Sequence, residues 1–276
     1  MKENNVAEIK RFNIYHRILH LAVVISFLGL VITGMPLRYA DAPWAEWFME
    51  FLGGFKGAGL IHRICAVITF GYFAAHIGYV LYFIVVIKKF RFNPFGPDSM
   101  VPGIKDLEDI YQAFNWFLGQ GPRPQFDRWT YWEKFDYWAV FWGVGIIGLS
   151  GLLLWFPVFF GHYFPGWVFN IATIIHSDEA LLAAGFIFTT HFFNSHLRPD
   201  KFPMDRVIFT GRLSLHELKY ERPLEYQRLV EENRIEEYKI GPQAGWARVA
   251  GVLFGSVAIL IGLLLLVFII LGQFYY

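Results

Sequence analysis

Five long apolar segments restrict the fold of this chain more than any other feature of its sequence. They cover about residues 15–35, 60–87, 137–160, 170–196 and 249–271. Each is long enough to cross the hydrocarbon core of a bilayer. In lipid a segment must satisfy its own backbone polar groups, so each can cross only as a helix. The sequence therefore predicts an all-α integral membrane protein with five spans.

Charged residues make up only 17% of the chain, and their distribution predicts its orientation. Lys and Arg concentrate in the N-terminal tail up to Arg17, between Lys88 and Lys134, and between Arg198 and Lys239. The intervening loops hold few cations. The positive-inside rule then predicts a cytoplasmic N-terminus and a periplasmic C-terminus. We expect a multi-pass protein of a bacterial or archaeal cytoplasmic (inner) membrane, with a lipid environment and no nucleic acid partner.

Three consecutive parts are expected along the chain. Residues 1–200 would form a four-helix transmembrane bundle, residues 201–245 a solvated, helical cytoplasmic connector, and residues 246–276 a fifth transmembrane helix. Ser214 and Glu217 have the spacing of a helix-capping pair. In the loop after the first span, Trp44 and Trp47 predict a short amphipathic helix anchored in the membrane interface.

Histidines at matched depths in the spans predict metal ligation. His62 and His76 are fourteen residues apart on the second span, and His176 and His191 are fifteen apart on the fourth. These spacings correspond to roughly 21 and 22 Å of helix, and each pair returns to within about 40–60° of one face. His62 and His176 would lie at the outer depth. His191 would lie at the inner depth, with either His76 or His20 as its partner.

Heme is the cofactor that these histidines suit best, because a six-coordinate heme takes one imidazole from each side of its ring. The one cysteine, Cys65, and the absence of a Cys-x-x-Cys-His motif predict that the heme is held non-covalently. Arg63, next to His62, is a candidate partner for the heme propionates. Two hemes b are expected, or three if His76 is also a ligand.

Several short motifs make the chain resemble the family of formate dehydrogenase gamma subunits and nickel–iron hydrogenase cytochromes b. The motifs are Arg17-Ile-Leu-His20, Ile61-His62-Arg63, Glu133-Lys134 and Gly151-Leu-Leu-Leu-Trp-Phe-Pro157, with His176 and His191 at the positions of the fourth-span ligands. The resemblance covers about residues 10–205. It implies a di-heme fold in which His62 and His176 hold the outer heme, and His20 and His191 the inner heme.

The same resemblance implies a quinone site beside the inner heme, near Tyr131, Trp132, Glu133 and Lys134, with His191 adjacent. Quinone chemistry moves protons as well as electrons, so the site needs a titratable group. The candidates for that group are Glu133, Lys134, Asp136 and His196. The chain departs from the family pattern at His76, in the spacing of fifteen between the fourth-span histidines, and in its fifth span.

The expected function is that of a cytochrome b subunit of a respiratory oxidoreductase complex. It would pass electrons between menaquinone or ubiquinone and a periplasmic partner, either an iron–sulfur subunit or a multiheme c-type cytochrome. It would be the electron-transfer subunit of that complex rather than an enzyme alone. Two alternatives remain open at this point: a membrane protein for heme or metal transport or assembly, and a structural anchor whose histidines are core residues.

Overall fold

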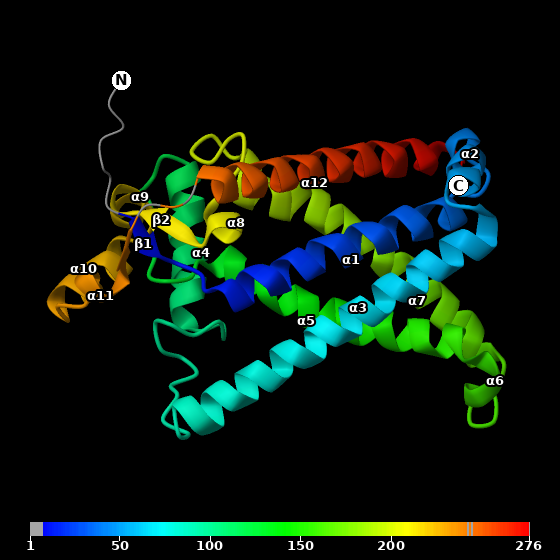
Figure 1. Cartoon of the computed structure of the whole chain (residues 1–276), viewed down its shortest axis with the longest axis horizontal. Coiled ribbons are helices and arrows are strands. Elements are labelled where there is room, and N and C mark those ends of the chain that lie inside the picture. The colour runs from blue at the N-terminus through cyan, green and yellow to red at the C-terminus, as the bar shows by residue number, and fades with distance from the viewer. Residues whose placement is uncertain (1–7, 242, 244, 276) are drawn as a thin grey trace. The chain divides into compact units, whose positions relative to one another are not determined.

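A computed structural model describes residues 8–241, 243 and 245–275 of the chain, which are mostly helical (Figure 1). Residues 1–7, 242, 244 and 276, which belong to the three predicted parts, lie outside the described residues. Among the described residues, five helical segments are long and apolar enough to cross a membrane, as predicted. They are α1 (Ile14–Arg38), α3 (Gly54–Tyr82) continued by η1 (Phe83–Ile87), α5 (Tyr131–Trp155), α7 (Trp167–Phe186) continued by η2 (Ile187–His191) and η3 (Phe193–Leu197), and α12 (Gly245–Gly272) followed by the short η4 (Gln273–Tyr275).

The third span is displaced from its predicted position. Its helix begins at Tyr131, six residues before the apolar run that starts at Tyr137, and ends at Trp155. Pro157 explains the early end, because proline disfavours helical geometry in the residue before it and cannot donate a backbone hydrogen bond. It begins the separate short helix α6 (Pro157–Phe160).

Two compact units interleave along the chain. Unit 1 comprises residues 1–17, 81–139 and 206–252, and unit 2 comprises residues 18–80, 140–205 and 253–276. This grouping follows contacts in space rather than the linear order of bundle, connector and fifth helix.

Unit 2 is held together by small residues where its helices meet. A methyl group added at Gly262 of α12 would lie 2.6 Å from the ring of Phe192, and one added at Gly272 would lie 2.6 Å from the ring of Tyr39 on the loop after α1. A methyl group at Gly29 of α1 would meet the Cys65 sulfur of α3. Small residues allow this close approach between membrane helices.

The loop after α1 contains the predicted short helix, α2 (Pro43–Phe51). Trp47 is half exposed, and its role as an anchor in the membrane interface stays a prediction. Trp44 is instead buried, with its ring 5.2 Å from that of Phe268 on α12. Trp44 therefore packs α2 against the helical bundle of unit 2.

Unit 1 contains a small three-stranded antiparallel sheet, which the all-α expectation did not include. The central strand β1 (Glu8–Lys10) lies between β2 (Arg212–Ser214) and β3 (Lys239–Ile240). Three- and two-residue strands are too short to give a recognisable alternation in the sequence. The strands are held instead by contacts between residues more than 200 positions apart.

The connector is helical, but it is not simply solvated. It contains α8 (Val207–Thr210), α9 (Leu215–Glu221), α10 (Pro223–Glu231) and α11 (Ile235–Tyr238). Ser214 caps α9 in a reciprocal pair with Glu217, as predicted. A small buried core is formed by Ile9, Leu213, Leu218 and Leu229. The N-terminal strand thus covers apolar side chains that the connector cannot bury alone.

Candidate metal centre

His62 of α3 and His176 of α7, both in unit 2, lie close together with their ring planes steeply inclined. Their ring centroids are 6.1 Å apart, with an angle of 65° between the ring planes. Both side chains are half-buried. The structure therefore brings together the two histidines that the sequence placed at one depth.

Neighbouring groups fix which nitrogen of each ring carries the proton. His176 Nδ1 lies 2.9 Å from the carbonyl oxygen of Ile147, which can only accept, so Nδ1 donates. His62 Nδ1 lies 2.8 Å from the Thr33 hydroxyl, whose own proton goes to the Gly29 carbonyl at 2.7 Å. His62 Nδ1 therefore also donates. In both neutral imidazoles the lone pair is then on Nε2, the nitrogen that remains for a metal ion.

The spacing of the two rings fits two ligands on opposite sides of one metal ion. Metal–imidazole bonds are about 2.0–2.1 Å long, and the ring centroid lies roughly 1 Å behind the nitrogen, so such ligands have centroids about 6 Å apart. Among the described residues, no group of three or more His, Cys, Asp and Glu side chains could hold a metal ion. Two imidazoles alone suit a heme, whose macrocycle supplies the other four ligands.

Gly151 of α5 leaves the space that the His176 ring occupies. A methyl group added at Gly151 would lie 2.9 Å from His176 Cε1 and 3.2 Å from its Nδ1. We predict that Gly151→Val displaces the ring. On the proposal below that this pair holds a heme, the variant should contain at least half of one equivalent less heme per chain, measured as pyridine haemochrome. Gly145→Val is the matched control, because a methyl group there meets nothing within 4 Å. Equal heme contents in the two variants would contradict the prediction.

A second histidine cluster forms in unit 2 from His20 of α1 with His191 and His196 at the end of the fourth span. The ring centroids of His191 and His196 are 6.1 Å apart, with perpendicular planes at 89°. His20 lies within electrostatic range of both. His20 thus lies in the electrostatic vicinity of His191 and of His196, which is buried.

A π-helical end of the fourth span explains the position of His196. In an α-helix, residues five apart differ by about 140° around the axis, so His191 and His196 would face different sides. From Ile187 to Leu197 the span is mostly π-helical. Its i→i+5 hydrogen bonds place residues five apart nearly above one another, and such turns are frequent at functional sites. Sequence periodicity assumes an α-helix and could not indicate this.

His76 has a different environment from His20. Its ring packs edge-on against Phe141 of α5, with centroids 6.1 Å apart, and Phe141 also contacts Phe73 at 5.1 Å. His76 therefore lies in an aromatic contact between α3 and α5.

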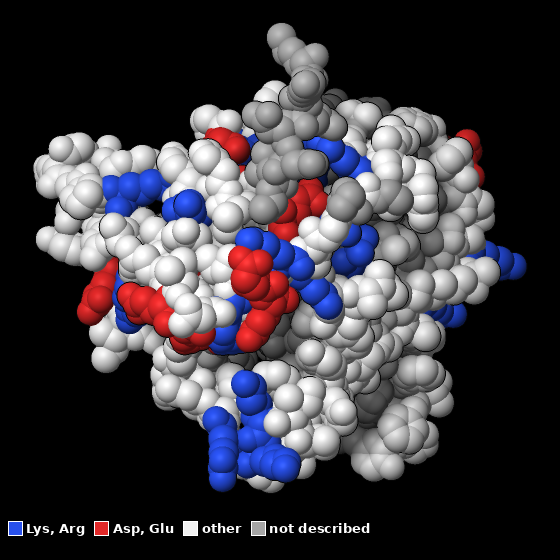
Figure 2. All heavy atoms as spheres, turned by 60° about the vertical axis from the view of Figure 1, so that its left-hand side comes forward, with Lys and Arg blue, Asp and Glu red and all other residues white. Residues whose placement is uncertain are grey.

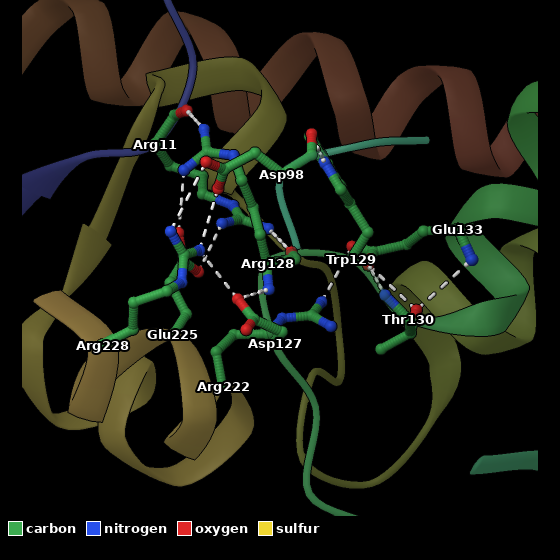
Figure 3. Close-up of polar contacts among 10 residues, drawn as sticks. All are labelled: Arg11, Asp98, Asp127, Arg128, Trp129, Thr130, Glu133, Arg222, Glu225 and Arg228. Carbon is green, nitrogen blue, oxygen red and sulfur yellow. Dashed lines mark hydrogen bonds and ion pairs between the residues drawn. The ribbon is translucent and has the colours of Figure 1, made fainter. Parts of the chain in front are cut away.

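The predicted quinone-site residues of α5 belong to unit 1, where several of them make structural contacts. Glu133 accepts from the backbone and hydroxyl of Thr130 at 2.8 and 2.9 Å, and pairs with Arg222 at 2.8 Å (Figure 3). Lys134 pairs with Asp106 at 2.9 Å. Glu133 and Lys134 are thus each held in an ion pair. Tyr131 and Trp132 join an aromatic cluster, with ring centroids 4.9 Å apart.

The arginines near the first histidine pair differ in their contacts. Arg63 is exposed, and its guanidinium lies 5.6 Å from the Trp155 ring centroid. Arg38, which the sequence interpretation did not single out, is paired with Asp178 at 2.7 Å and also donates to Ser177. The acidic Asp178 within the fourth span could have indicated this pair in the sequence, because ionisable groups in a membrane usually have a partner.

No family model matches the chain, and no curated protein matches it.

Proposed function

We propose that the chain is a membrane cytochrome b that carries electrons between a quinone and a redox partner through two hemes b. The observation that carries this proposal is the pair of His62 and His176. Their rings have the separation that two ligands of one iron need, and their Nδ1 protons are directed to protein acceptors. Helices long enough to cross a membrane carry both. Ligating histidines in proteins usually have such second partners.

The second heme is assigned to His191 and His20, with His76 as the alternative ligand. Proximity of His20 to His191 supports the first assignment. A heme at each histidine group would give two centres along the fourth span. Fifteen residues of helix cover roughly 22 Å, and the two hemes would be separated by most of that length. This arrangement would let electrons pass between the two membrane faces.

Bound heme would supply one-electron transfer, and the residues of the chain would set where it happens. His62 and His176 would bind and orient the macrocycle through Nε2. Thr33 and Ile147 would hold the two imidazoles in the ligating tautomer. Gly151 would keep the position of the His176 ring open.

The quinone is proposed to react at the cytoplasmic side, near the His20–His191–His196 cluster. His196 is the sequence candidate that lies beside His191. Glu133 and Lys134 are held in ion pairs, which makes them weaker candidates for proton transfer. By the positive-inside rule the N-terminus is cytoplasmic, so the His62–His176 pair would face a periplasmic partner, either an iron–sulfur subunit or a multiheme c-type cytochrome.

A heme count of the purified chain tests the proposal. We expect a reduced-minus-oxidised spectrum of b type and two hemes per chain by pyridine haemochrome. His20→Ala is expected to lower the count to one, and His76→Ala to leave it at two. A chain without b-type heme would refute the proposal. Loss of heme with His76→Ala but not with His20→Ala would assign the second site to His76, and three hemes per chain would make both residues ligands.

A further inference from the structure

Helix α4 (Ile104–Phe117), in unit 1, has its apolar face exposed and part of its polar face buried. The exposed apolar side chains recur at spacings of three and four and form one stripe along the helix. They are Ile104, Leu107, Tyr111, Phe114 and Phe117. Asp106 and Asp109 are buried on another face together with Ala113. This is the reverse of a helix that packs its apolar face into a protein core.

The buried acidic face packs against the start of α5. Asp106 pairs with Lys134 at 2.9 Å, and the Trp138 indole donates to the Met100 carbonyl just before α4 at 2.9 Å. Helix α4 crosses the first turns of α5 instead of running beside them (Figure 1). Lys134 and Trp138 lie about 4.5 and 10 Å along α5 from its first residue. The apolar run of α5 begins at Tyr137, between Lys134 and Trp138. These contacts therefore hold α4 at the level of α5 where its polar start gives way to its apolar run.

The segment before α4 carries both positive charge and aromatic side chains on the surface. Lys88, Lys89 and Arg91 are exposed, and so are Phe90 and Phe95, at 74% and 71%. Phe95 approaches the start of α4, because a methyl group at Gly103 would lie 3.8 Å from its ring. Basic and aromatic side chains together favour the headgroup region of a membrane that contains anionic lipid.

We infer that α4 lies in the plane of the membrane, with its stripe from Ile104 to Phe117 in the acyl-chain boundary of a leaflet that contains anionic lipid. The segment that contains α4 connects two helical segments able to span the membrane. It follows η1, which ends at Ile87, and precedes α5, which begins at Tyr131. In-plane helices bury such an apolar face at the boundary of headgroups and acyl chains. The ion pair of Asp106 with Lys134 neutralises the face turned toward the protein. This inference does not depend on heme binding.

Spin labels on the two faces of α4 test the inference. The full chain carries Cys65→Ser and one new cysteine, and is placed in nanodiscs of phosphatidylcholine with phosphatidylglycerol. Leu107→Cys and Phe114→Cys label the apolar stripe, while Glu108→Cys and Gln112→Cys label exposed polar positions of the same helix. We expect labels at 107 and 114 to relax faster with oxygen than with a water-soluble nickel chelate, and labels at 108 and 112 to show the reverse.

Two results with the spin labels would overturn the inference. Fast relaxation by the nickel chelate at 107 and 114 would place the stripe in water. Protection from both reagents would mean a protein contact, and dipolar broadening between labels on two copies would identify a second chain as the occupant. A measurement on the unmodified chain guards against misfolded variants. A photoactivatable phosphatidylcholine should give adducts on the stripe, and their absence there, with adducts elsewhere on the chain, would also refute the inference.

Discussion

Replacing His62 with alanine is expected to halve the heme content of the purified protein, from two hemes per chain to one. The proposed iron would lose one of its two imidazoles, whose ring centroids lie 6.1 Å apart. His176→Ala should have the same effect, because each ring is proposed to ligate the same iron. Pyridine haemochrome and protein assays on the same sample give the ratio.

The matched control for this prediction is His162→Ala. His162 is exposed in the segment between α6 and α7, where its Nδ1 lies 2.8 Å from the Val158 carbonyl oxygen. Its loss should leave two hemes per chain. Added imidazole should restore part of the heme in His62→Ala by filling the vacated position. Two hemes in both His62→Ala and His176→Ala would exclude this pair as ligands.

The sequence predicts the spanning helices well because their cause is local. Each needs an unbroken apolar run, and hydropathy along the chain records that run directly. The pairing of His62 with His176 was also predictable, since helix rise converts sequence spacing into depth. Ser214 with Glu217 was predictable for the same reason: a capping box joins residues three apart.

Features that depend on distant residues could not be predicted. The sequence gives no reason to pair Glu133 with Arg222, 89 residues away, and it therefore left Glu133 as a proton-transfer candidate. β1 is held by strands that begin about 200 residues later. His196 was predicted as a titratable group of the quinone site, but its place beside the His191 ring depends on a π-helical turn that hydropathy and an α-helical period do not reveal.

A buried network of charges in unit 1 leads to the second large effect. Glu225 of α10 accepts from Arg11 and from Arg128, each at 2.8 Å, and Arg11 also donates to the Arg128 carbonyl (Figure 3). The side chains of Arg11 and Glu225 are only 4% and 3% exposed. Near them, Arg228 pairs with Asp98 and Asp127 at 2.8 Å. Figure 2 shows basic and acidic residues interleaved on this side of the protein. Glu225 thus joins α10 to the N-terminal segment and to the residues that precede α5.

Glu225→Gln is expected to destabilise unit 1 by about 3–5 kcal/mol, because it leaves the buried guanidinium of Arg11 and the partly buried guanidinium of Arg128 without their carboxylate. Burial lowers the pKa of Arg11 to about 10, although Glu225 acts in the opposite direction. Arg11 is therefore still charged at pH 7, and it would stay charged and poorly compensated in the variant. Hydrogen exchange should report the loss as faster exchange in α9, α10 and β1, together with a lower midpoint of thermal unfolding.

The control for Glu225→Gln is Glu236→Gln, which removes a carboxylate from an exposed pair with Lys239. Exposed pairs contribute about 0–1 kcal/mol, so its effect should be small.

The triple replacement Arg11→Met, Arg128→Met and Glu225→Met separates charge from packing. If uncompensated charge causes the loss, removing all three charges should recover much of the stability, because buried ion pairs replaced by apolar side chains are often neutral or better. A triple variant no more stable than Glu225→Gln would assign the loss of stability to packing and hydrogen bonds. Equal hydrogen exchange in Glu225→Gln and Glu236→Gln would show that Glu225 does not hold the unit together.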